Sequence, residues 1–190
     1  MTTTTPDVAV ATYTVDPGHS SVGFAVRHLG FSKVRGRFTA FEGTLELDQA
    51  DLSTLSTHAS IDAGTITTGD EKRDAHLRSD DFFAVEEHPE LSFTSTGTRS
   101  VGSDRLEIDG ELTMRGVTHP VTFDAVYLGE ARDPWGGDRV AFEATTKVNR
   151  KDYGLNWNAA LETGGFLVAN EVEIVLEIQA VKAAGADDQA

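Results

Sequence analysis

Apolar and polar residues alternate with a period of two along much of the chain. In the stretch 105–115 the even-numbered residues are apolar or glycine, and the odd-numbered residues are charged or polar. The same alternation recurs over 121–128, 139–149 and 171–179. It is typical of β-strands that have one buried face and one solvated face. We therefore expect a mainly β fold.

Weaker alternation indicates further strands over 13–15, 20–28, 57–63 and 91–97, so that we count eight or nine in all. Glycine-bearing or polar links separate most of them, as in an antiparallel meander. Eight strands of this kind either close into a barrel or divide into a sandwich. The periodicity does not distinguish these two architectures.

The stretch 34–48 changes phase part-way along. Val34 and Phe38 occupy even positions, whereas Phe41, Leu45 and Leu47 occupy odd positions. One extra residue in a strand turns every later side chain to the opposite face. We predict a β-bulge near residues 40–43.

Two segments break the strand rhythm. Residues 70–84 predict a short helical element with Asp70 as its N-cap, which would bring Phe82 and Phe83 against one end of the sheet. Residues 151–169 form an irregular region rich in glycine and asparagine, and both segments are candidate lids or mouth loops. The second segment carries three aromatic residues, Tyr153, Trp157 and Phe166.

Charge and composition narrow the function. The chain has 190 residues, with 16 Lys and Arg against 31 Asp and Glu, and hence a formal charge of −15. That balance argues against nucleic-acid binding and against adsorption onto an anionic membrane. There is no cysteine, which excludes disulfides and thiolate chemistry. We see no signal peptide and no apolar run of about 18 residues, so we expect a cytoplasmic protein that does not span a membrane.

Catalytic and metal-binding patterns are weak. Arg73, Asp74 and His76 could act together in acid–base chemistry, and His19, His28 and His76 could join an aspartate around a metal or haem. Scattered histidines more often hydrogen-bond the ends of strands and helices, and a charged helix is more often a solvated face. We therefore assign no catalytic residue and no metal ligand.

The phenylalanines on the strand faces have two interpretations. They could fill an ordinary core, or they could line a cavity for an apolar ligand. The pattern alone favours the filled core, because protein interiors are close-packed.

Several ordered motifs resemble the YceI-like family. They include Tyr13–Ser20, Arg73–Phe83, Gly110–Thr118 and Arg150–Leu155. The resemblance runs over about residues 12–182. It leaves 1–11 and 183–190 as flexible tails.

The resemblance implies a single antiparallel eight-stranded lipocalin-like β-barrel with a short helical element, about 70–84, near one end. It also implies non-enzymatic binding, carriage or storage of an isoprenoid lipid, either an isoprenoid quinone or a polyprenyl phosphate or alcohol. No further cofactor is implied. The net charge favours a neutral quinone head group over a phosphate. We also include a homodimer among the expected assemblies.

Combining the strand faces with the resemblance gives two sets of candidate ligand-binding residues. The apolar set, which would line the cavity, is Phe24, Val26, Phe38, Ile61, Phe82, Phe83, Phe93, Leu112, Met114, Phe123, Phe142 and Leu176. The polar set, which would lie at the cavity mouth, is His28, Arg73, Asp74, His76 and Arg150.

Overall fold

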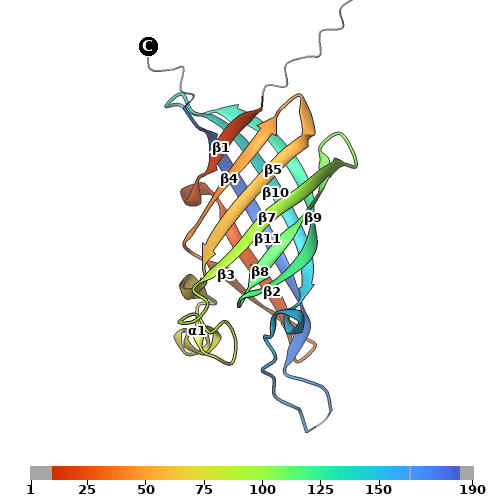
Figure 1. Cartoon of the computed structure of the whole chain (residues 1–190). Helices are drawn as coiled ribbons and strands as arrows, with labels where there is room; N and C mark the ends of the chain where they lie inside the picture. Colours follow the sequence, from red (N-terminus) through yellow and green to blue (C-terminus); the bar gives the residue numbers. More distant parts are fainter. Residues whose placement is uncertain (1–9, 163, 185–190) are drawn as a thin grey trace, which may run out of the picture.

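The strands expected from the alternation form a barrel with one α-helix at one end (Figure 1). The structure is a computed structural model that describes residues 10–162 and 164–184. The helix is α1 (Glu71–Arg78). The strands are β1 (Ala11–Val15), β2 (Ser21–His28), β3 (Ser32–Phe38), β4 (Phe41–Asp48), β5 (Asp51–Asp62), β6 (Ile66–Thr67), β7 (Glu90–Ser100), β8 (Arg105–Met114), β9 (Val117–Arg132), β10 (Asp138–Asn149) and β11 (Val168–Lys182).

The barrel closes because β1 pairs with both β4 and β11. The 3-10 turn η1 (Pro17–His19) divides β1 from β2, and η2 (Ala63–Thr65) divides β5 from β6. β3 and β4 are divided at residues 39–40. When each divided strand is counted once, eight antiparallel strands follow one another around the barrel. The predicted eight-stranded barrel is confirmed.

The alternation correctly identifies the inward face. The even-numbered residues of β8 are buried, and the ladder pairs Phe93 with Leu112 and Ile108 with Phe123. The rings of Phe93 and Phe123 meet edge to face with centroids 5.2 Å apart. The inward residues of successive strands therefore pack on one another inside the barrel.

The phase change in 34–48 has a different cause from the predicted β-bulge. The strand stops after Phe38 and resumes at Phe41, so that two separate strands replace one bulged strand. The backbone N–H groups of Thr39 and Ala40 both donate to the hydroxyl of Thr65, at 3.2 Å each. This side-chain acceptor replaces the ladder partner that the two N–H groups would have in a continuous strand.

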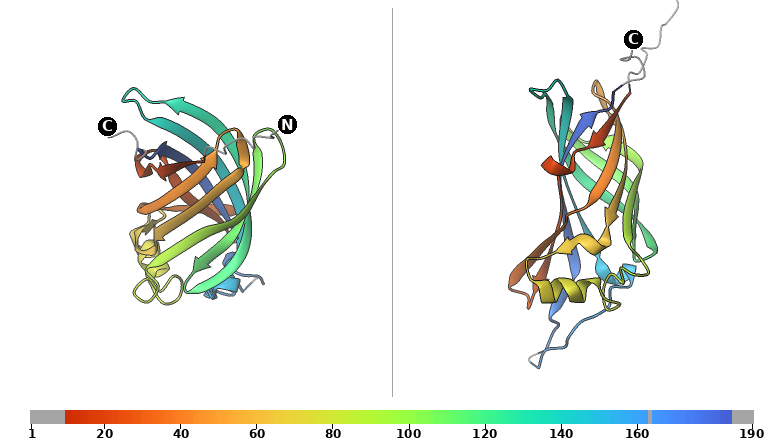
Figure 2. Two further views of the ribbon diagram at one scale, coloured as in Figure 1. Left: turned by 45° about the horizontal axis from the view of Figure 1, so that its top comes forward. Right: turned by 90° about the vertical axis from the view of Figure 1, so that its left-hand side faces the viewer.

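The helical segment is shorter than predicted. Asp70 is the N-cap, and its carboxylate accepts a hydrogen bond from the backbone N–H of Arg73 at 3.0 Å, which confirms its expected role. The helix ends at Arg78, and residues 79–84 continue as turns rather than as helix. Figure 2 shows α1 lying across one end of the barrel.

The two halves of the barrel differ in their filling. Tyr13, Leu47, Leu106 and Val140 are almost wholly buried and fill the half in which β1 begins and β11 ends. The hydroxyl of Tyr13 accepts a hydrogen bond from the side-chain amide of Gln49 at 2.9 Å. The other half, towards α1, is hollow.

The ends of the barrel lie close to the boundaries expected from sequence. β1 begins at Ala11 and β11 ends at Lys182. Residues 1–9 and 185–190 of the predicted tails lie outside the described residues, so their flexibility stays a prediction. Among the described residues, no helix has the length and apolar character needed to cross a bilayer.

Candidate functional site

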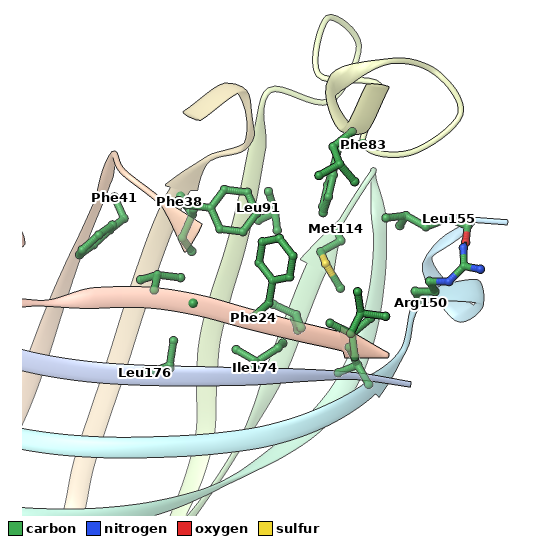
Figure 3. A pocket seen from close by; sticks show the side chains of 18 of the residues that line it. Phe24, Phe38, Phe41, Phe83, Leu91, Met114, Arg150, Leu155, Ile174 and Leu176 are labelled. Carbon is green, nitrogen blue, oxygen red and sulfur yellow. The ribbon is translucent and has the colours of Figure 1, made fainter. Parts of the chain in front are cut away.

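The hollow half of the barrel contains a cavity of about 880 Å³ (Figure 3). Ligand pockets typically measure about 300–1,000 Å³. The filled core that the pattern alone favours is therefore wrong for this half. All twelve predicted apolar residues line the cavity: Phe24, Val26, Phe38, Ile61, Phe82, Phe83, Phe93, Leu112, Met114, Phe123, Phe142 and Leu176.

Inward residues that border the cavity are less buried than those of the packed half. Phe24, Ile174 and Leu176 face inwards yet remain partly accessible, whereas Val140 is fully buried. Phe24, Ile174 and Leu176 are more accessible than Val140 because their side chains border empty volume. The sequence pattern is the same in both halves, since each inward residue follows an outward one.

Two glycines make room for aromatic rings that lie across the strands. A side chain on Gly36 would collide with the ring of Phe24, and one on Gly110 would collide with the ring of Phe93. Glycine within a strand often marks such a close approach. These two glycines therefore set the positions of two rings of the cavity wall.

An aromatic lid closes part of the cavity end. Phe83 meets Phe38 edge to face at 5.9 Å, and Phe82 lies 5.4 Å from Trp157, measured between ring centroids. Trp157 also meets the imidazole of His76 edge to face at 4.7 Å. The lid joins the helical segment to the irregular region after β10, as expected for two mouth loops.

The polar residues suggested for acid–base chemistry are not grouped around a common point. Asp74 is 5% exposed, and its carboxylate accepts hydrogen bonds from the side chains of Thr67 and Thr68 and from the backbone N–H of Thr68. Arg73 donates to the hydroxyl and the carbonyl oxygen of Thr68. His76 contacts Asp81 at 2.8 Å rather than Asp74.

Asp74 stabilises the start of α1, because it binds the two threonines that precede the helix. Burial opposes its ionisation, but the hydrogen bonds from Thr68 and Thr67 hold the pKa of Asp74 below its ordinary value. It does not belong to the cavity wall, unlike the predicted mouth residues His28, Arg73, His76 and Arg150. Its expected place at the mouth is therefore corrected.

Arg150 also has a structural role, although it belongs to the cavity wall. It belongs to the 3-10 turn η3 (Arg150–Tyr153), is 4% exposed, and donates to the carbonyl oxygens of Leu155, Trp157 and Ala169. Figure 3 shows its guanidinium group turned towards the segment of Leu155. Burial lowers the pKa of Arg150. Its hydrogen bonds hold the loop that carries Trp157.

The charged residues of the cavity wall gather mainly at one opening. β3 pairs with β6 only at Arg37 and Phe38, so the described part of β3 before them has a strand partner on one side only. Wall residues on this edge and around the start of α1 are exposed, so the cavity reaches the surface between them. We call this opening the portal and define it by Arg27, Ser32, Asp70, Lys72 and Arg73.

The portal carries three cations and one carboxylate. This local balance is opposite in sign to the net charge of the chain. A charged head group experiences nearby charges more strongly than distant ones, because salt screens interactions beyond about 10 Å. The preference for a neutral head group, which depended on the net charge, is therefore not supported by the charges at the portal.

The candidate metal ligands do not form a cluster. His19, the last residue of η1, has its Nδ1 atom 2.8 Å from the carboxylate of Asp16. His28 and His76 instead lie on the cavity wall. Among residues 10–162 and 164–184, no group of three or more His, Asp or Glu side chains is arranged to hold a metal ion.

Several wall residues were not among the predicted site residues. Those on strands follow the same alternation and could have been found from it, whereas those of the irregular region after β10 have no periodic signal. The first group includes Leu91, Val148, Val172 and Ile174, and the second includes Leu155, Trp157 and Leu167.

A model of the YceI-like domain matches residues 13–180. The chain belongs to the YceI-like family. Among curated relatives, Protein YceI of Salmonella arizonae is 37% identical over 181 residues, which cover 94% of this chain and 91% of the relative. The Salmonella paratyphi B protein of the same name matches with the same identity and coverage.

Solved structures share the YceI-like barrel. The crystal structure of Burkholderia cenocepacia BcnA aligns with a TM-score of 0.77 at 21% identity, covering 87% of this chain and 98% of that one. A polyisoprenoid binding domain from Saccharophagus degradans, implicated in plant cell wall breakdown, aligns with a TM-score of 0.65 at 17% identity, covering 91% and 99%. At these identities the likeness concerns the fold.

Proposed function

We propose that this YceI-like protein binds an isoprenoid lipid in its barrel cavity and carries or stores it without chemical conversion. One observation carries the proposal: the cavity wall is almost wholly apolar, while most of its charged residues lie at the portal. An amphiphile with a long apolar chain and one polar head matches that distribution. Burying the chain contributes about 25 cal/mol per Å² of apolar surface.

The isoprenoid class rests on two supports. The wall combines aromatic rings with branched aliphatic side chains, and such a wall packs well against a methyl-branched chain. A structural neighbour is described as a polyisoprenoid binding domain, and we extend that ligand class to this chain as part of the proposal.

The head group lies at the portal in this proposal. Lys72 and Arg73 suit the phosphate of a polyprenyl phosphate, and His28 and His76 can donate hydrogen bonds to the carbonyl oxygen of a quinone. Comparing the affinities of the protein for a quinone and for a polyprenyl phosphate decides between the two head groups.

Carriage without conversion fits the polar contacts. Asp74 accepts hydrogen bonds from Thr67 and Thr68, which precede α1, and His76 contacts Asp81 and Trp157. The proposed function requires no cofactor. The cytoplasmic location and the homodimer stay predictions from the sequence.

The experiment combines extraction with titration. Protein purified from its native host is extracted with organic solvent, and the extract is analysed by mass spectrometry for prenyl-type lipids. Delipidated protein is then titrated with a short-chain ubiquinone and with a short-chain polyprenyl phosphate. Trp157, which lies in the lid, reports binding by fluorescence, and W135F removes the signal of the only other tryptophan.

We expect a prenyl lipid in the extract and a saturable change in Trp157 fluorescence with at least one ligand. An extract without prenyl lipid, together with no saturable change for either ligand, would refute the proposal.

A further inference from the structure

The acidic chain contains one segment without carboxylates. Residues 17–41, which include β2 and β3, contain none of the 31 Asp and Glu residues but four of the 16 Lys and Arg residues. These four are Arg27, Lys33, Arg35 and Arg37. Lys33 pairs with Glu173 of β11 at 2.6 Å, and the three arginines form no ion pair with a described residue. The β2–β3 hairpin is therefore a local basic surface.

The tip of this hairpin exposes apolar side chains. Phe31 is 86% exposed and Leu29 is 38% exposed. The backbone N–H of Leu29 donates to the carbonyl oxygen of Leu167 at 2.9 Å, which ties the tip to the neighbouring loop. In that loop Phe166 is 62% exposed, and the ammonium of Lys151 lies 5.7 Å from the centre of its ring.

The opposite end of the barrel provides a contrast. Trp135, in the turn between β9 and β10, is 87% exposed, but the arginines that flank it are paired with acids, Arg132 with Asp138 and Arg139 with Asp133. The β2–β3 tip and the β9–β10 turn lie at opposite ends of the barrel (Figure 1). Exposed aromatic side chains thus occur at both ends, and only the end with the portal joins them to a cationic hairpin.

We infer that the β2–β3 tip and the Phe166 loop dock onto the surface of an anionic lipid bilayer. The net charge of the chain argues against such adsorption, but the hairpin that would face the bilayer has the opposite charge. Phe31, Leu29 and Phe166 would enter the region of the head groups, and the cations of the hairpin would face the lipid phosphates. The apolar side chains stand on two projecting loops, a form that suits insertion between lipids better than contact with a flat protein face.

The position of the portal supplies a reason for such docking. Arg27 of β2 and Ser32 of β3 belong to the portal, and the exposed tip lies between them in the chain. A docked barrel would hold the portal close to the bilayer, where a water-insoluble lipid is concentrated. This reason depends on the proposed function, whereas the docking itself depends only on the exposed side chains and charges.

The test is flotation of the full chain with vesicles. One set contains phosphatidylcholine alone, and the other contains phosphatidylcholine with phosphatidylglycerol. We expect the protein to float with the second set and to be released as salt is added, because salt screens exposed charges. The double variant F31S/F166S should lose about tenfold or more in vesicle partitioning, and the control W135S should float as the wild type does.

A second pair of variants tests the charge. R35E/R37E on the hairpin and R105E/R132E, which alters two exposed arginines of the other barrel end, change the net charge equally. We expect loss of flotation for the first variant and retention for the second. Any one of three results would overturn the docking. They are absence of flotation with anionic vesicles, equal flotation of F31S/F166S and W135S, and equal loss of flotation in both charge variants.

Ligand titration separates this inference from the proposed function. F31S/F166S should bind the short-chain ubiquinone or polyprenyl phosphate with the wild-type affinity, because neither residue belongs to the cavity wall. Vesicle binding without ligand binding would preserve the docking and refute the lipid cavity. Ligand binding without vesicle binding would preserve the lipid cavity and refute the docking.

Discussion

At the residue scale, neighbouring positions of one strand have opposite roles. Ile174 of β11 borders the cavity, and Val175, the next residue, faces outwards and is 36% exposed. Both are β-branched apolar residues, so the same substitution can be compared inside and outside the barrel wall.

We predict that I174W blocks ligand binding while the protein still folds. The larger ring would occupy the empty volume beside Phe24, whose backbone is opposite that of Ile174, and would not bury a charge. Affinity for the short-chain ligand should fall by about tenfold or more, measured by Trp157 fluorescence in chains that also carry W135F and against a blank for the new ring. V175W is the matched control and should bind normally; equal affinity in the two variants would contradict the assigned cavity wall.

A second residue-scale prediction concerns Asp74. D74A should lower the free energy of unfolding by about 2–3 kcal/mol, because three hydrogen-bond donors of Thr67 and Thr68 lose a buried carboxylate. Urea denaturation measures the change, and D80A, an exposed acid nearby, should stay within about 0.5 kcal/mol. The folded D74A protein should retain its ligand affinity, and a selective loss of binding would restore Asp74 to the mouth.

At the scale of elements, the barrel depends on how its divided strands are joined. η1 interrupts the first strand, and Asp16 beside it accepts a hydrogen bond from Arg139 of β10 at 2.7 Å. Arg139 also donates to Asp133, in the turn between β9 and β10, at 2.9 Å. This network holds the interrupted first strand to the wall of the barrel.

The network predicts a pH-dependent contribution to stability. Hydrogen bonds from Arg139, and then from His19, lower the pKa of Asp16 to about 2 from 3.8. The folded state thus binds this proton less readily than the unfolded state, so the stabilisation is present above pH 3.8 and is lost as the pH falls towards about 2.

D16N should therefore cost about 1 kcal/mol at about pH 6 and progressively less towards pH 2. Urea denaturation across this range measures the effect. D124N, an exposed acid on β9, is the control and should have little effect at either end. A D16N effect that stays constant with pH would show that ionisation of Asp16 does not contribute.

The sequence predicted the strands and their buried faces better than it predicted the cavity that they enclose. Alternation identified the buried face of β8 and the phase change after Phe38, because both follow from the local period of the backbone. It could not distinguish Val140, which is packed, from Ile174, which borders the cavity. That difference depends on how eight strands together divide the interior volume. The place of Asp74 was missed because its hydrogen-bond partners depend on the local three-dimensional turn before α1.

At the scale of the whole molecule, one end of the barrel is filled and the other is hollow. The filled end holds Tyr13 and Val140, and the hollow end has the lid and the portal. A ligand that binds only the folded barrel must stabilise it as a whole, because binding draws the folding equilibrium towards the native state.

We predict that a bound short-chain isoprenoid ligand raises the free energy of unfolding by about 2.7 kcal/mol when its free concentration is about 100 times Kd. Thermal unfolding with increasing ligand measures the effect. V175W should show the full increase, and I174W should show a much smaller one at the same concentration. An equal increase in both variants would place the binding outside the cavity.

The partly unpaired edge of β3 has a consequence for self-association. A strand edge with free backbone N–H and C=O groups can accept a strand from another molecule. Lys33 and Arg35 lie on the part of β3 that precedes its pairing with β6, so two copies that approached edge to edge would bring like charges together. The same cations would therefore oppose aggregation through strand addition, and a homodimer would require a different surface.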